Sequence, residues 1–336
     1  MFRVRFFKAR VMKLHSGLNI LFSSLCLIFL FFPVQLATAQ QYDQYSLSTF
    51  SPFIYNPAYS GVEEALMLQT GWRSQWMGYT DQDGKTVNPV SYFVAASAPI
   101  YPISSGLGVV FSRQELAYHE RTDFRLDYAY SIALNEESQL SLGISGKVSQ
   151  LSLNIGMLNP ADPADPLIKE TGTKKSMVPE IGTGVFYRSA KTEAGLSVMN
   201  LLGSEFETGN ILLQDQMTFT IYAQHRFRLL DERFRKIDMA PSLLMKTSMK
   251  STQLDLNLLA YVNDRFWGGA GYRLQDGVIL MAGAGFGNFD AGIAYDVTTS
   301  NTKEVTGKGS LEIQLRYGFP VYPPVPQSSG FNTRHL

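Results

Sequence analysis

The last part of the chain alternates strictly between apolar and polar residues. Because successive side chains of a strand point to opposite faces, this order predicts a strand with one apolar and one polar face. The apolar face consists of Leu311, Ile313, Leu315, Tyr317 and Phe319, and the polar face of Ser310, Glu312, Gln314, Arg316 and Gly318. A strand of this kind can separate a hydrocarbon phase from a polar one.

About fourteen segments with this alternation follow one another along the chain, and most have the length of about ten residues that a tilted strand needs to cross a membrane. They predict an all-β fold, a transmembrane antiparallel β-barrel of about 14 strands and of the outer-membrane type, with apolar residues toward lipid and polar residues toward the lumen. The segments are 64–73, 89–98, 105–113, 121–134, 138–149, 179–189, 193–200, 216–227, 237–248, 252–262, 265–274, 278–286, 289–298 and 309–319.

The connections between these segments favour the same fold. An even number of strands places both ends of a bacterial barrel on the periplasmic side, with short turns there and longer loops outside. The longer connections are Ser74–Asn88, Gln150–Val178, Asn200–Asp215 and Thr299–Lys308. The charged connection Arg228–Lys236 is expected on the turn side and departs from the rule by its length, as do two short connections on the loop side.

The N-terminus has the features of an export signal. Five basic residues precede an apolar stretch that ends in Ala37-Thr38-Ala39, and we expect cleavage between Ala39 and Gln40. The alternative is a retained membrane anchor, since the apolar stretch is long enough to span. The predicted organisation is therefore a signal peptide at 1–39, an N-terminal periplasmic or plug segment at 40–62, the barrel at 63–319 and a proline-rich tail at 320–336.

Composition excludes several classes of protein. The only cysteine, Cys26, lies within the predicted signal, so the mature chain has no disulfide and no thiolate site. Without the five basic signal residues the mature chain keeps 24 basic against 29 acidic residues, a net charge of −5, which does not favour nucleic-acid binding. Beyond the signal no apolar run is long enough for a membrane-spanning helix.

The charged residues at inward positions allow two interpretations, a selective pore or internal docking surface, and a lumen wall stabilised by salt bridges. A barrel of this size leaves interior space that water, a loop or the N-terminal segment has to occupy. His119 lies near Glu115 and Glu120 and could act as a base, but no nucleophile pattern accompanies it. The three scattered histidines of the mature chain do not suggest a metal site. We expect no enzymatic activity and no cofactor.

Two short motifs carry a resemblance to a known family. Asn56, Pro57, Ala58, Tyr59, Ser60 and Gly61 form a run of turn-forming residues around an aromatic ring, and Arg73, Gln75 and Trp76 follow at the end of the first strand. Both motifs resemble those of the PorP/SprF family of outer-membrane proteins of Bacteroidota. The Gly-x-Pro that usually follows the tryptophan is replaced here by the longer stretch 78–89.

The resemblance implies an outer-membrane protein, embedded in lipid, that acts in type IX secretion and gliding motility. It implies contacts with periplasmic components and with a secreted adhesin or other cargo, and motif residues that contact these partners. The N-terminal segment would lie in the lumen or at its periplasmic mouth and present Tyr55 and Tyr59, and the loops 150–178 and 200–215 would meet the cargo. The alternative is a channel for small or hydrophobic solutes with an N-terminal hatch.

Overall fold

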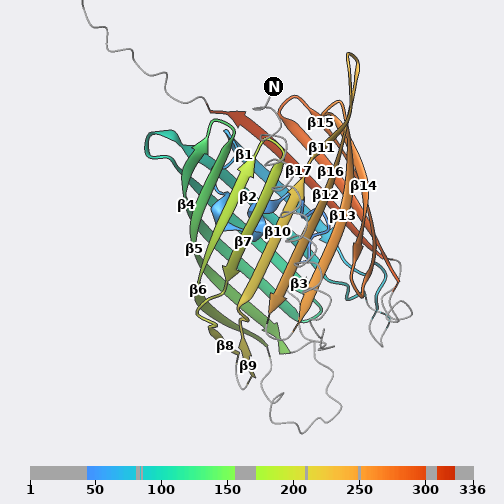
Figure 1. The fold of residues 1–336 in the computed structure, drawn as a ribbon. Helices are drawn as coiled ribbons and strands as arrows, with labels where there is room; N and C mark the ends of the chain where they lie inside the picture. Colours follow the sequence, from blue (N-terminus) through green and yellow to red (C-terminus); the bar gives the residue numbers. More distant parts are fainter. Residues whose placement is uncertain are drawn as a thin grey trace, which may run out of the picture. The chain divides into compact units, whose positions relative to one another are not determined.

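The computed structural model describes residues 44–80, 84, 86–155, 172–208, 211–248, 251–299 and 309–321. The predicted signal peptide, residues 40–43 of the predicted plug segment, residues 249–250, most of the predicted tail and parts of the four longer predicted connections lie outside this part of the chain. Within it, 14 antiparallel strands close into a barrel in which β1 pairs with β17 (Figure 1). No helix of the described part has the length and apolar composition of a membrane span.

The strands follow one another around the barrel in chain order, so each pairs with its sequence neighbours. β10 and β11 are two parts of one strand interrupted at Arg226, since both pair with β12. A separate hairpin, β8 with β9, lies between β7 and β10. The barrel strands are β1 (Ala65–Ser74), β2 (Val90–Ile100), β3 (Ser105–Leu116), β4 (His119–Asn135), β5 (Ser138–Asn154), β6 (Thr173–Ser189), β7 (Thr192–Met199), β10 (Thr218–His225), β11 (Phe227–Glu232), β12 (Arg235–Ser248), β13 (Thr252–Val262), β14 (Phe266–Arg273), β15 (Gly277–Phe286), β16 (Phe289–Thr298) and β17 (Ser310–Pro320).

The alternation of the sequence becomes the two surfaces of the barrel. On β17, Ile313 and Leu315 are exposed on the outer surface, whereas Glu312 and Gln314 are completely buried. The other strands repeat this arrangement; on β4, for example, Leu126 is exposed on the outer surface. The predicted fold, the number of strands and the direction of the apolar faces are therefore confirmed.

The predicted boundaries are wrong where strands continue beyond the apolar band. β4, β5 and β6 each run over 17 residues, so the predicted loop 150–178 shrinks to the connection between Asn154 and Thr173. At the start of β4, the ion pair Arg113–Glu120, at 2.7 Å, links it to β3. In β5 the apolar residues change faces along the strand, from the exposed Ile144 and Val148 to the buried Leu151 and Leu153. One continuous alternation therefore does not mark the whole strand.

Two predicted connections contain additional strands. The predicted loop 200–215 holds the hairpin of β8 (Glu205–Thr208) and β9 (Ile211–Gln214), and the predicted turn 228–236 is the tip of a long hairpin of β11 and β12. The predicted tail is also shortened by one residue, because Pro320 still pairs with Ala65 at the end of β17. A proline is tolerated at this outermost position, where its missing donor affects the end of one ladder only.

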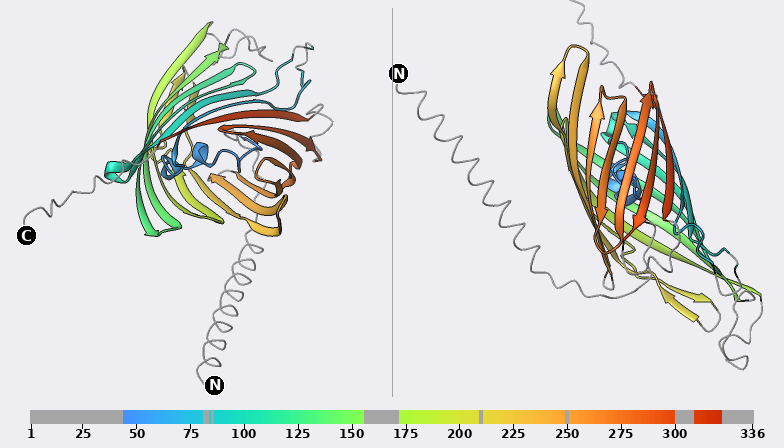
Figure 2. Two further views of the ribbon diagram at one scale, coloured as in Figure 1. Left: turned by 90° about the horizontal axis from the view of Figure 1, so that it is seen from above. Right: turned by 90° about the vertical axis from the view of Figure 1, so that its right-hand side faces the viewer.

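Three short helices complete the described part: α2 (Pro52–Tyr55), η1 (Pro57–Tyr59) and η2 (Tyr101–Ile103). α2 and η1 belong to the segment Gln44–Val62, which we name the lumen segment. Both views of Figure 2 show it, in blue, surrounded by the strands. The two ends of the barrel are named from their connections: the turn end carries the turn between β4 and β5, and the loop end carries the β8–β9 hairpin.

Candidate functional site in the barrel lumen

The lumen segment fills the interior of the barrel with apolar side chains. Phe53, Tyr55 and Tyr59 pack with Phe93 of β2 and Phe186 of β6 in one buried cluster. A second cluster surrounds Leu47 and Phe50 against inward residues of β12 to β16. Each large apolar side chain removed from a water-filled lumen stabilises the packed state by about 1.5–3 kcal/mol. The segment is therefore packed as the hydrophobic core of the barrel interior.

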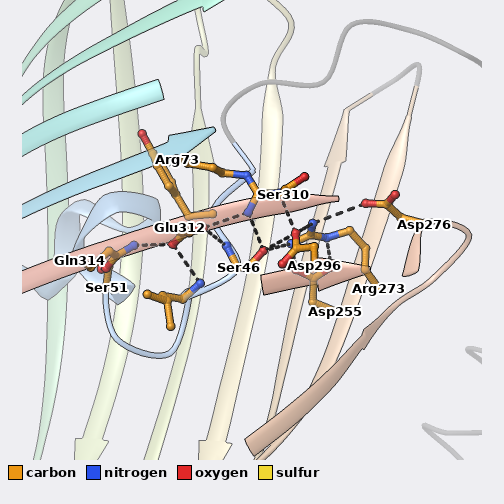
Figure 3. Close-up of polar contacts among 12 residues, drawn as sticks. Ser46, Ser51, Arg73, Asp255, Arg273, Asp276, Asp296, Ser310, Glu312 and Gln314 are labelled. Atoms are coloured by element: carbon orange, nitrogen blue, oxygen red, sulfur yellow. Dashed lines mark hydrogen bonds and ion pairs between the residues drawn. The ribbon is translucent and has the colours of Figure 1, made fainter. Parts of the chain in front are cut away.

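Near the loop end, the first described residues of the segment are bound by a carboxylate of β17. The backbone nitrogens of Ser46 and Leu47 donate to the two carboxylate oxygens of Glu312 at 2.6 and 3.1 Å. The Ser46 hydroxyl donates to Asp296 at 2.7 Å and accepts from Arg73 at 2.8 Å (Figure 3). These three wall residues thus hold two backbone nitrogens of the segment and the Ser46 side chain at the same time.

These contacts belong to a connected series of buried charges along the inner wall, which we name the ion-pair ring and which is formed by Arg73, Asp255, Arg273, Asp296 and Glu312. Arg73 bridges Asp296 and Glu312 at 2.7 and 3.1 Å, and Arg273 bridges Asp255 and Asp296 at 3.0 and 3.1 Å. All five side chains are nearly inaccessible. Charges buried this deeply are tolerated only when they are paired and hydrogen-bonded, so the ring requires all its members.

In the middle of the lumen, polar side chains bind the turn that precedes and includes α2. The Ser51 hydroxyl forms hydrogen bonds with the side chains of Gln69 and Gln314. Arg125 of β4 donates to the backbone oxygens of Phe53 and Ile54 at 2.9 and 2.8 Å. These bonds satisfy backbone and side-chain groups that would otherwise be buried without partners.

The first sequence motif lies near the turn end and is centred on Asn56. Its side-chain oxygen accepts from the backbone nitrogen of Ala58 at 2.9 Å and caps η1. Its side-chain nitrogen donates to the backbone oxygens of Val185 and Leu196, at 3.0 and 3.2 Å, which belong to paired residues of β6 and β7. Asn56 therefore attaches the segment to the seam between two strands.

The motif can approach the wall because inward positions of the neighbouring strands are glycines. A Cβ atom at Gly143 would lie 2.3 Å from the backbone nitrogen of Ala58, and one at Gly184 would lie 2.1 Å from the Asn56 side chain. Side chains at these positions would displace the motif, so glycine is required there. We name these positions the glycine floor: Gly106, Gly108, Gly143, Gly184 and Gly195.

The lumen segment leaves the barrel interior at the start of β1. The Gly61 nitrogen donates to Ser97 at 2.8 Å, and the Val62 oxygen accepts from Arg188 at 3.0 Å. The Tyr59 hydroxyl donates to Glu63 at 2.8 Å. Desolvation by burial raises the pKa of the Tyr59 phenol well above its ordinary value, so it stays a neutral donor.

The segment therefore runs from the loop end at Ser46 to the turn end at Val62. β1 rises about 3.3 Å per residue, so Arg73 of the ring lies about 26 Å along that strand from Ala65. Of the two positions expected for the segment, the lumen and its periplasmic mouth, it occupies the lumen. The expectation that it presents Tyr55 and Tyr59 is wrong, because both are buried among lumen side chains.

The structure separates the predicted motif residues between the barrel interior and its two ends. Five of them are buried: Asn56, Pro57, Ala58 and Tyr59 in the lumen, and Arg73 in the ion-pair ring. A partner cannot contact these five side chains directly in this structure. Gly61 lies at the turn end, where its backbone nitrogen donates to Ser97. Gln75 and Trp76 line the loop end: the backbone nitrogen of Gln75 donates to the Pro89 oxygen at 2.9 Å, and that of Trp76 donates to the Ser310 hydroxyl at 3.1 Å.

Sequence reasoning missed the wall residues that receive the segment. Gln69 and the glycine floor were not singled out, and neither was Ser46 of the segment itself, although a glycine at an inward strand position indicates close approach of another chain segment. Among the described residues, no group of three or more His, Cys, Asp or Glu side chains could hold a metal ion. What the arrangement does is to occupy the lumen and to fix one chain segment across it.

Comparison with known proteins adds the relationship of the chain to a family. The curated proteins gave no match. Solved structures of the toluene transporters TbuX of Ralstonia pickettii and TodX of P. putida are 10% and 9% identical, with TM-scores of 0.44 and 0.43. The alignments cover 81% and 80% of this chain and 94% and 93% of those chains. A FadL homologue of Pseudomonas aeruginosa is 11% identical with a TM-score of 0.38, over 85% of this chain and 96% of that one. These likenesses concern barrel architecture alone.

The family comparison is more specific than the structural one. The model of the type IX secretion system membrane protein PorP/SprF matches residues 37–317, which include both motifs, the lumen segment and nearly all of the barrel. The chain therefore belongs to the PorP/SprF family of type IX secretion system membrane proteins.

Proposed function

We propose that this protein is a closed docking barrel of the type IX secretion system, located in the outer membrane with its apolar belt in lipid. It holds a secreted surface protein at the loop end and contacts periplasmic components at the turn end. The observation that carries the proposal is the lumen segment, which is fixed at the loop end by Glu312 and at the turn end by its bonds to β6 and β7. A wall that binds its own chain in this way suits a rigid platform better than a pore.

The loop end offers a structured surface for such a cargo. The β8–β9 hairpin packs Phe206 against Leu151 and Val178 of the extended β5 and β6. The Glu180 carboxylate accepts from the backbone nitrogens of Leu202 and Ser204 at 3.1 and 2.7 Å, which fixes the start of the hairpin. Apolar side chains remain exposed on this platform, among them Met177 and Leu212. Exposed apolar side chains on a fixed platform favour contact with a protein.

A deletion in the lumen segment tests the proposal. Removal of residues 42–62 is expected to leave a heat-modifiable barrel in the outer membrane and to abolish export or surface attachment of the cargo. The control is Gly146→Leu, which adds a side chain at an outward position with open space around it. Normal export after the deletion would contradict the proposal, and so would solute uptake that depends on the barrel while export does not.

A further inference from the structure

The hairpin of β11 and β12 extends past the turns on both of its sides. On one side the backbone nitrogen of Arg226 donates to the backbone oxygen of Lys191, in the β6–β7 turn, at 2.7 Å. On the other side the backbone nitrogen of Asn263 donates to the backbone oxygen of Lys236 at 2.9 Å. Within the described residues no strand pairs with either side of the tip beyond these bonds, and the hairpin projects from the turn end in Figure 1. The tip is therefore a two-stranded ribbon outside the barrel wall.

One edge of this ribbon presents unpaired backbone groups. Of the described strands, only β12 pairs with β11, and it does so from Phe227 to Glu232. The register shifts between Arg228 and Leu230, so the intervening Leu229 has no partner in β12. Its side chain is 64% exposed. Unpaired strand edges are templates for another strand unless the protein covers them.

The tip also carries an aromatic ring and an excess of positive charge. Phe234 is 84% exposed, and the Arg233 guanidinium lies 5.4 Å from the centre of its ring. The carboxylate of Asp231 is bound by Arg228 at 2.9 Å. The side chains of Arg235 and Lys236 are exposed next to Phe234. Positive charge around an apolar anchor favours an acidic partner.

We propose that the free edge of β11 binds an extended acidic segment of a periplasmic protein, which adds to the hairpin as one more strand. Backbone hydrogen bonds to β11 would supply affinity, Leu229 and Phe234 would contact its apolar side chains, and Arg235 and Lys236 its carboxylates. The inference rests on the proposed function, because that function places the turn end in the periplasm.

Photocrosslinking in intact cells tests this site. A photoreactive phenylalanine analogue replaces Phe234, and the crosslinked peptide is identified by mass spectrometry. The same analogue at Phe286, an exposed aromatic residue of another turn-end hairpin, is the matched control. We expect an adduct with an acidic segment of a periplasmic protein at position 234 and none with that segment at position 286.

Two variants separate strand addition from chance proximity. Leu229→Pro removes a backbone donor at a residue that has no partner in β12, and R235E/K236E reverses the charge beside the probe. Each is expected to lower the adduct yield at least about tenfold, while the barrel stays heat-modifiable. A lipid adduct only, the absence of any adduct, or a yield that both variants leave unchanged would overturn the inference. Export dependent on the lumen segment would still support the proposed function in each of these cases.

Discussion

Ser46 and Asp296 lie 250 positions apart in the sequence, and the hydroxyl of the first donates to the carboxylate of the second at 2.7 Å inside the barrel. The same hydroxyl accepts from Arg73 and Arg273, at 2.8 and 3.1 Å, so one serine oxygen joins both arginines of the ion-pair ring. The start of the lumen segment is thus hydrogen-bonded to the buried charged side chains of the wall. Loss of the Ser46 hydroxyl should therefore disturb the ion-pair ring, and loss of a ring residue should loosen the start of the lumen segment.

Removal of one arginine from the ring should destabilise the barrel strongly. Arg73→Met leaves Asp296 and Glu312 buried without their main counter-ion, which costs about 3–5 kcal/mol for a pair of this kind. The measurement is the midpoint of unfolding in detergent. The matched control is Arg113→Met, whose pair with Glu115 is partly exposed and should contribute less than about 1 kcal/mol. Equal effects of the two substitutions would contradict the assigned role of the ring.

A side chain on the glycine floor should expel the motif and open the lumen. Gly143→Leu places its Cβ against the backbone of Ala58, which cannot yield without moving the segment. We expect ion conductance across planar bilayers that the unsubstituted protein lacks. Gly146→Leu on the same strand is the control, because nothing lies within 4 Å of the added Cβ. A closed lumen in Gly143→Leu would show that the segment tolerates displacement without opening the barrel.

Replacement of the Asn56 amide by a carboxylate should weaken the attachment to β6 and β7. Asn56→Asp keeps the cap of η1 but loses the hydrogen bonds to the oxygens of Val185 and Leu196, each of which contributes about 0.5–1.5 kcal/mol. Protection of residues near Asn56 against hydrogen exchange should fall. Asn135→Asp is the control, since Asn135 uses only its oxygen, toward the Glu137 nitrogen. Unchanged protection in Asn56→Asp would refute the attachment.

The direction of the lumen segment predicts which side of the membrane can reach its start. An epitope placed directly before Gln44 should bind antibody on intact cells, because Ser46 is held among ring residues near the loop end. An epitope placed after Val321 should bind only after permeabilisation, since β17 ends at the turn end. The reverse pattern would show that the segment enters from the periplasmic side.

The sequence was sufficient for the barrel because each strand in the apolar belt has to satisfy two environments at once. Leu311 to Phe319 shows this in an alternation without exception. Beyond the belt that constraint ends, so the extended β4 to β6 and the β11–β12 hairpin could not be located from polarity.

The site could be predicted only in part, because it depends on contacts between distant positions. The motif around Asn56 and the residue Arg73 were recognisable as unusual, but their partners Glu312 and Leu196 have no local signal that links them to the segment. The inward glycines were readable one by one as places of close approach. Which segment of the chain packs against them follows only from the register of β3, β5, β6 and β7.

The central claim is that residues 44–62 close the lumen of the barrel, and conductance of single molecules in planar bilayers tests it most directly. The full-length protein should give no steady current, and the protein lacking these residues should give discrete open steps of uniform size. Open steps of the same size in both proteins would contradict the claim.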